Sequence, residues 1–257
     1  MGLITIVGIV VAIAAAARST WSPCGLSMLS TITPLSESGR GHRYGGTAAW
    51  FVAGAVGGGA TLGAAAALLA TGVAAAGPSA ALAAGLAAGL ALVAAAGDAG
   101  LTPVPFPLFR RQVDERWLDQ YRAWFYGAGF GWQVGVGLAT YIMTAGVFLT
   151  VAVAILTAQP GSALLICTVF GVARGMTVLL TRRLRSPEAL RSFHRRFGRL
   201  ETPVRIGTIV VEAGAAAVLA AAVWAPAAFV VALAAAAGTA GHLRGRAAGA
   251  VVGSTAP

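Results

Sequence analysis

A short polar stretch near the amino terminus carries the side chains best suited to chemistry. Residues 21–34 read Trp-Ser-Pro-Cys-Gly-Leu-Ser-Met-Leu-Ser-Thr-Ile-Thr-Pro, with a thiol at Cys24 between Pro23 and Pro34. Pro23 lacks a backbone N–H and disturbs a helix, which leaves carbonyl groups without their usual donors beside the thiol. These groups suit thiol exchange or binding of a soft ligand, and an inert buried thiol is the alternative.

The apolar segment before this stretch is too short to cross a membrane alone. Residues 3–17 would form about 22 Å of helix, against a hydrocarbon core of about 30 Å. The crossing must therefore continue through the break, and irregular backbone at that depth survives only inside a protein or beside a water-filled cavity. We expect a substrate path along Trp21, Ser22, Pro23 and Pro34, unless the break is a kink packed for shape. The nearby Ser and Thr hydroxyls line this path or bond to free carbonyls.

The composition predicts an integral membrane protein of the all-α class. The chain has 257 residues, of which 58% are hydrophobic and 10% charged. Its net charge of +10 comes from arginines in the connections between apolar segments. Charge so placed is typical of membrane topology, and we expect no nucleic-acid partner. The partner expected for the apolar surface is the lipid bilayer of the inner or plasma membrane.

Seven apolar segments are candidate membrane helices, at 3–35 (broken), 47–71, 80–97, 126–157, 163–181, 205–223 and 226–241. The last two are divided only by Pro226, so the count is six or seven. Arginine-bearing connections at 36–46, 98–125 and 182–204 alternate with uncharged ones. The positive-inside rule then places the amino terminus outside and the arginine-rich loops in the cytoplasm.

Two connections have amphipathic patterns. In residues 109–124, Val113, Trp117, Tyr121 and Trp124 recur at helical spacing, which predicts a helix on the membrane surface or a docking surface for a soluble partner. Residues 184–200 alternate apolar and basic side chains and favour a basic interfacial segment attracted to anionic lipid.

The fourth apolar segment repeats features of the first. It opens with a Gly-rich run containing Trp132, Gln133, Gly135 and Gly137, and its tryptophan precedes Gly135 as Trp21 precedes Cys24. We expect two inverted three-helix repeats with broken first helices, at 1–97 and 126–223, joined by a cytoplasmic amphipathic connector at 98–125 and followed by an extra helix and cytoplasmic tail at 224–257. Paired broken helices of opposite direction usually mark a midplane site in carriers.

Three features together suggest a family. They are Ser22-Pro23-Cys24 with a proline ten residues later, a basic turn from Arg40 to Arg43 before a Gly-rich segment, and Gly131-Trp132 in the second repeat. This pattern resembles the DsbD/CcdA transmembrane thiol-disulfide carriers, which include cytochrome c biogenesis proteins and group with LysE-like transporters. The resemblance implies a relay of reducing equivalents from a cytoplasmic thioredoxin-like protein, using one cysteine from each repeat.

The second repeat departs from this family because Val134-Gly135 stands where a Pro-Cys pair would be. Cys167 is the other cysteine, and its predicted depth differs from that of Cys24 by about 8 Å, whereas a disulfide joins Cα atoms at most about 7 Å apart. A disulfide between them would need rearrangement.

Three charged residues lie within the apolar segments. Arg174 and Glu212 are predicted at similar depth, where they can form an ion pair that locks two helices or couples to an ion. Arg18 precedes the first break, where it either favours a Cys24 thiolate or extends to a polar surface.

The sequence therefore predicts a carrier that moves a small solute or reducing equivalents at a site between two broken helices. In the relay form of this function Cys24 is the catalytic residue. The alternative is a membrane-embedded scaffold subunit of a larger complex, without transport of its own. We expect no hydrolase, no metal site and no cofactor, because no motif for them occurs.

Overall fold

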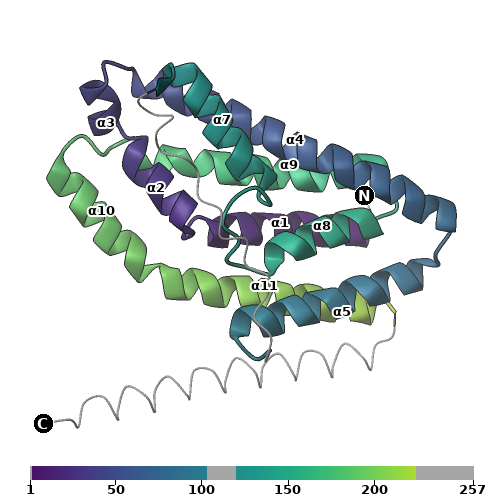
Figure 1. Cartoon of the computed structure of the whole chain (residues 1–257). Helices are drawn as coiled ribbons and strands as arrows, with labels where there is room; N and C mark the ends of the chain where they lie inside the picture. Colours follow the sequence, from purple (N-terminus) through teal and green to yellow (C-terminus); the bar gives the residue numbers. More distant parts are fainter. Residues whose placement is uncertain (1, 103–119, 224–257) are drawn as a thin grey trace, which may run out of the picture.

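The computed structural model describes residues 2–102 and 120–223, and within these ranges all regular structure is helical (Figure 1). The helices are α1 (Leu3–Ser19), α2 (Pro23–Thr31), α3 (Pro34–Gly39), α4 (Tyr44–Ala76), α5 (Ala80–Ala99), α7 (Ala123–Val136), α8 (Gly146–Leu156), α9 (Pro160–Met176), the 3-10 helix η1 (Thr177–Thr181), α10 (Pro187–Arg199) and α11 (Glu201–Ala221). The all-α class is confirmed.

Four helices are long and apolar enough to cross a membrane. They are α4, α5, α9 with η1 (Pro160–Thr181), and α11. The pair α1 and α2 adds a fifth crossing if it is counted as one broken helix, and it is bent by 68°. The described residues thus contain four to five candidate crossings. The predicted segment 226–241, the tail and most of the amphipathic segment 109–124 lie outside the described residues.

The first break falls where a Ser-Pro sequence starts a new helix. Ser22 caps α2, accepting a hydrogen bond from the backbone N–H of Gly25 at 3.2 Å, and Pro23 occupies the first turn, where a missing N–H costs nothing. A Cβ atom at Gly25 would lie only 2.3 Å from the carbonyl oxygen of Thr20. Pro23 and Gly25 are therefore accounted for by this tight turn.

The second break separates α7 from α8. Gly137 ends α7 with a positive φ of 72°, a conformation that glycine adopts without strain. Residues 138–145 are irregular before α8 begins at Gly146. The predicted segment 126–157 is thus two short helices, and the expected interruption is present.

Glycines bring α4 against its neighbours at close range. A Cβ atom at Gly131 on α7 would lie 2.0 Å from the carbonyl of Phe51, and one at Gly59 on α4 would lie 2.6 Å from the carbonyl of Cys167 on α9. Lipid gives helices no hydrophobic reason to associate, so close backbone contact through small residues supplies the attraction. Helix α4 is consequently packed along both α7 and α9 (Figure 1).

Candidate functional site

Arg174 lies between the two breaks and contacts both. Its side chain on α9 is 2% exposed. One guanidinium nitrogen donates to the carbonyl of Ser19 at 3.3 Å and the other to the hydroxyl of Thr140 at 3.3 Å. Ser19 ends α1 and Thr140 belongs to the irregular segment after α7. Arg174 therefore joins the two interrupted helices, through the Ser19 backbone carbonyl at one break and the Thr140 hydroxyl at the other.

Cys24 lies near this cation. The thiol is buried at the start of α2, and it interacts electrostatically with Arg174. Cys167 is buried on α9, and no disulfide joins the two cysteines in the described chain. The cation beside Cys24 is thus Arg174, and not Arg18, for which this position was one of two alternatives.

Arg18 instead points toward the start of α11. Its guanidinium lies 3.6 Å from a carboxylate oxygen of Glu201, and its Nη1 has no hydrogen-bond partner. Asp98 and Arg205 are its other charged neighbours. Arg18 therefore belongs to a group of charges between α1, α5 and α11.

Asp98 holds the start of α8. Its carboxylate accepts hydrogen bonds from the backbone N–H of Ala145 at 2.8 Å and from the hydroxyl of Thr144. A carboxylate at a helix N-terminus also interacts favourably with the helix dipole. Arg205 donates to the Asp98 carbonyl at 3.0 and 2.7 Å. The last turn of α5 is thereby fixed to both α8 and α11.

Glu212 is the buried charge without a visible partner. Its side chain on α11 is 1% exposed, and neither carboxylate oxygen accepts a hydrogen bond. No ion pair links it to Arg174 among the described residues, so the predicted pairing is wrong. The two side chains face different neighbours: Arg174 reaches the helix breaks, whereas Glu212 lies beside Gly146 of α8.

Most of the predicted second-repeat site does not face this centre. Trp132 is 43% exposed and donates from its indole nitrogen to Thr61 at 3.2 Å, on the outer side of α4 and α7. Gln133 is half-buried. A Cβ atom at Gly135 would lie 2.1 Å from the Ala55 carbonyl, and one at Gly137 would lie 2.7 Å from the Phe170 ring. These glycines serve close packing, so they leave no open path.

The first-repeat residues are also accounted for by packing. Trp21 stacks on Phe197 of α10 with ring centres 4.2 Å apart and donates to the Phe197 carbonyl at 3.0 Å. Pro34 starts α3, which Thr33 caps. The hydroxyls of Ser30 and Thr31 donate to the carbonyls of Leu26 and Ser27, one turn earlier in α2.

Sequence reasoning missed a buried carboxylate at Glu37. Its oxygens accept hydrogen bonds from Tyr126 at 2.9 and 2.8 Å, from Arg40 at 3.1 Å and from Thr47. His42 lies 3.3 Å from the same tyrosine hydroxyl. The connection 36–46 had been interpreted only through its arginines. The available signal was a lone glutamate among small polar residues.

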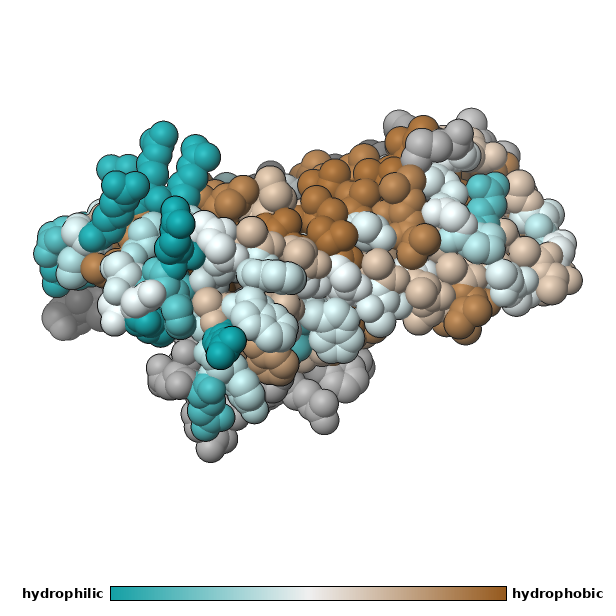
Figure 2. All heavy atoms as spheres, turned by 90° about the horizontal axis from the view of Figure 1, so that it is seen from above, coloured by the Kyte–Doolittle hydropathy of each residue, from teal (hydrophilic) through white to brown (hydrophobic). Residues whose placement is uncertain are grey.

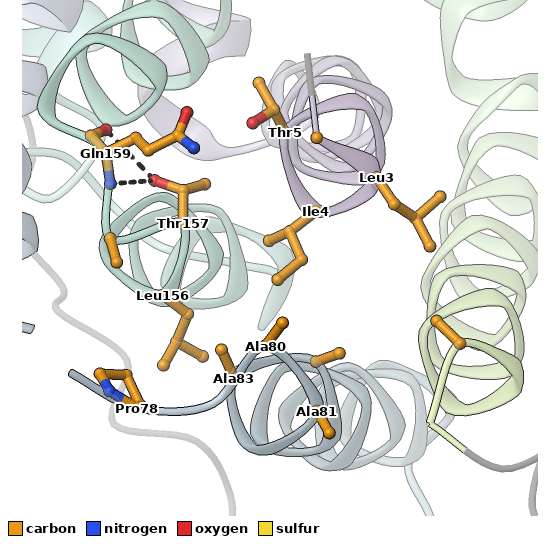
Figure 3. Close-up of a pocket in the computed structure, with 14 residues that line it drawn as sticks. Leu3, Ile4, Thr5, Pro78, Ala80, Ala81, Ala83, Leu156, Thr157 and Gln159 are labelled. Atoms are coloured by element: carbon orange, nitrogen blue, oxygen red, sulfur yellow. Dashed lines mark hydrogen bonds between the residues drawn. The ribbon is translucent and has the colours of Figure 1, made fainter. Parts of the chain in front are cut away.

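A cavity of about 440 Å³ opens at the other end of the molecule (Figure 3). Its lining is mainly apolar and comes from the start of α1, the α4–α5 turn, the α8–α9 turn and the end of α11. Thr157 and Gln159 are hydrogen-bonded to each other at its edge, as Figure 3 shows. It is remote from the Arg174 centre, and no predicted site residue lines it. Within the described residues no group of three or more His, Cys, Asp or Glu side chains could hold a metal ion.

The chain is similar to methylamine utilization proteins named MauF. It is 30% identical over 162 residues to the protein of Methylorubrum extorquens, covering 61% of this chain and 55% of that protein. The proteins of Methylobacillus flagellatus and Paracoccus denitrificans are also 30% identical, over 66% and 65% of this chain and 60% of their own lengths. The chain thus spans less than two thirds of these relatives. No protein-family model matches it, and no solved structure matches it.

These relatives overturn the expected resemblance. A DsbD/CcdA thiol-disulfide carrier connected with cytochrome c biogenesis is wrong, because the curated relatives carry the name MauF. The carrier function that rested on this resemblance is wrong with it. In the Pro-Cys pair that suggested the resemblance, Pro23 occupies the first turn of α2 behind the Ser22 cap, a position that accounts for the proline without a redox role. The alternative of a membrane-embedded subunit fits the MauF relatives better.

Proposed function

We propose that this chain is a membrane-embedded accessory subunit required for the use of methylamine. The observation that carries the proposal is the similarity to MauF over 61–66% of the chain. The subunit acts as a scaffold: it holds its helices, including the two interrupted ones, in a fixed arrangement within the membrane. Transport is not part of this role.

The contacts at the breaks support a fixed arrangement. Arg174 ties the end of α1 to the segment after α7, and Asp98 ties α5 to the start of α8. Glycine contacts between α4 and α7 leave no space for sliding, since added Cβ atoms would fall 2.0–2.2 Å from carbonyl oxygens at Gly131, Gly135 and Gly58. A carrier needs such interfaces to separate and re-form, whereas a scaffold is stabilised by them.

The distribution of charge supports the proposed orientation. The turns at 77–79 and 157–159 have no charged residue and meet at one end, around the cavity in Figure 3. The arginine-bearing connections 36–46 and 182–204 meet at the other end, where the backbone N–H of Leu35 donates to the carbonyl of Leu184 at 3.2 Å. Figure 2 shows hydrophilic residues gathered mainly at one end and a hydrophobic region across the middle. We place the arginine-rich end in the cytoplasm and the amino terminus outside.

The element order supports the inverted repeat as part of this proposal. The first half runs α1, break, α2, then α4 and α5, and the second runs α7, break, α8, then α9 and α11. In each half a broken helix precedes two longer ones. The breaks meet at Arg174, so the repeat provides the scaffold with a shared centre.

Helix α10 anchors the cytoplasmic end to lipid. Its apolar side packs on α2 through Phe197 and Trp21. Exposed arginines cover its other side and the preceding turn, namely Arg182, Arg183, Arg185, Arg191, Arg195, Arg196 and Arg199. Basic side chains at a membrane surface are attracted to anionic headgroups by about 1 kcal/mol each. The partner at this surface is therefore the anionic bilayer.

Deletion of the gene in the native host tests the proposed function. Growth on methylamine should be lost, while growth on a substrate that does not pass through methylamine continues at the normal rate. Expression of the wild-type chain from a plasmid should restore growth. Unchanged growth on methylamine after deletion would contradict the proposal.

A further inference from the structure

Glu212 is a buried carboxylate whose oxygens remain unsatisfied. Both Oε1 and Oε2 lack a hydrogen-bond partner among residues 2–102 and 120–223, although the side chain is 1% exposed. Buried polar groups in proteins are nearly always hydrogen-bonded, and an isolated buried charge is far more costly than a neutral group. A group that donates a hydrogen bond or carries positive charge is therefore expected beside this side chain.

The surrounding charges do not neutralise Glu212. Its charged neighbour is Asp98, which has the same sign. Arg18 is paired with Glu201 at 3.6 Å, and Arg205 donates to the Asp98 backbone carbonyl. The Asp98 carboxylate itself accepts hydrogen bonds from Ala145 and Thr144 at the start of α8. Arg174 donates to Ser19 and Thr140, so no cation among the described residues pairs with the Glu212 carboxylate and its single negative charge is uncompensated.

The space beside Glu212 is shaped by a glycine and by buried oxygens. A Cβ atom at Gly146 would lie 2.8 Å from Glu212 Oε1, 3.1 Å from Ala15 Cβ and 3.2 Å from Thr144 Oγ1. Glycine at this position therefore lets the Glu212 carboxylate lie directly against the start of α8. One helical turn beyond Ala15 lies Ser19, whose buried Oγ also has no hydrogen-bond partner. The C-terminal end of α1 adds the negative end of a helix dipole.

We propose that a small monovalent cation binds at the Glu212 carboxylate, between α1, α8 and α11. A proton would remove the charge and still leave a buried O–H group without an acceptor. A monovalent ion balances the single excess charge and satisfies both carboxylate oxygens. Unwound helix ends bind sodium in other membrane proteins by related chemistry. This site goes beyond the accessory role proposed above and does not depend on it.

Thermal unfolding of the full chain in detergent tests the site. We would compare sodium chloride, methylammonium chloride and choline chloride at equal ionic strength. A ligand that binds only the folded state raises Tm with its concentration. We expect Tm to rise in sodium or methylammonium salt relative to choline salt, and the two salts identify which cation is preferred. The rise should be absent in Glu212→Gln and retained in Glu188→Gln, a control in which an exposed carboxylate on α10, paired with Arg191, is neutralised.

An equal Tm in all three salts for the wild-type chain would overturn the proposal and indicate a hydrated, protonated carboxyl group. Retention of the full rise in Glu212→Gln would also overturn it. If Glu212→Gln does not fold, equilibrium dialysis of the wild-type chain with radioactive sodium, with and without competing methylammonium, measures binding directly. Gly146→Ala then supplies the comparison, because its methyl group would lie 2.8 Å from the present position of Oε1, displace the carboxylate and weaken binding. Wild-type protein that retains no ion in dialysis contradicts the site.

Discussion

Arg174 connects two segments that lie 121 residues apart in the chain, at Ser19 and Thr140. It has two neutral oxygens as partners, and the Phe170 ring lies 5.8 Å from its guanidinium carbon. Charge-assisted hydrogen bonds to such oxygens contribute about 1.5–3 kcal/mol. The structural role of Arg174 is therefore measurable as coupling between the breaks.

A double-mutant cycle measures this coupling. Arg174→Ala and Thr140→Val should each lower the free energy of unfolding, and the double variant should be less destabilised than the sum, by about 0.5–3 kcal/mol. Chemical denaturation in detergent, followed by circular dichroism, provides the values. Strict additivity would show that the Arg174–Thr140 contact does not contribute.

Tyr126 tests the buried Glu37 group. Tyr126→Phe removes the hydroxyl that donates to both Glu37 oxygens and leaves a buried carboxylate with fewer donors. We expect a loss of about 1–3 kcal/mol in the free energy of unfolding. Tyr121→Phe is the control, because the Tyr121 ring is 45% exposed. Equal effects of the two substitutions would argue against the Glu37 contacts.

The contribution of single residues was the hardest part to predict. Depth along a helix placed Arg174 and Glu212 at one level, but depth does not specify the direction in which a side chain points. Glu37 meets Tyr126 across 89 residues, a contact that no local pattern records. Trp132 shares a sequence offset with Trp21, yet the glycine face of α7 turns toward α4 and leaves Trp132 outside.

Helices were easier to predict than contacts. The expected segments 47–71, 80–97, 163–181 and 205–223 overlap α4, α5, α9 with η1, and α11, because a long apolar run has few alternatives to a membrane helix. The break at Trp21–Cys24 followed from its length and prolines. The role of the Gly-rich run differed from expectation, since close helix packing and a flexible hinge both use glycine.

A pair of glycine substitutions distinguishes these two roles. Gly131→Ala places a Cβ atom 2.0 Å from the Phe51 carbonyl and should destabilise the chain by about 1–3 kcal/mol. Gly57→Ala on α4 meets nothing within 4 Å and should be neutral or stabilising by up to about 1 kcal/mol, as alanine favours helix. Thermal unfolding of both variants checks the prediction. A tolerated alanine at Gly131 would exclude tight packing of α7 on α4.

At the scale of the whole molecule, the structure combines four to five candidate crossings with breaks joined by buried polar contacts. The N-terminal ends of α1 and α9 are also linked, since Thr5 donates to Ser162 at 3.2 Å. A carrier alternates between outward-open and inward-open forms and must part helices at this end. A fixed scaffold keeps them together throughout its work.

The most direct measurement is therefore growth on methylamine of the deletion strain that expresses a Thr5→Cys, Ser162→Cys chain. The side-chain oxygens are close enough for sulfur atoms at these positions to bond at about 2.0 Å after a small shift. Disulfide formation is verified by mobility on non-reducing gels, and each single variant is a control. The account predicts wild-type growth with the disulfide formed. Loss of growth that a membrane-permeant reductant restores would contradict it, because the function would then require α1 and α9 to separate.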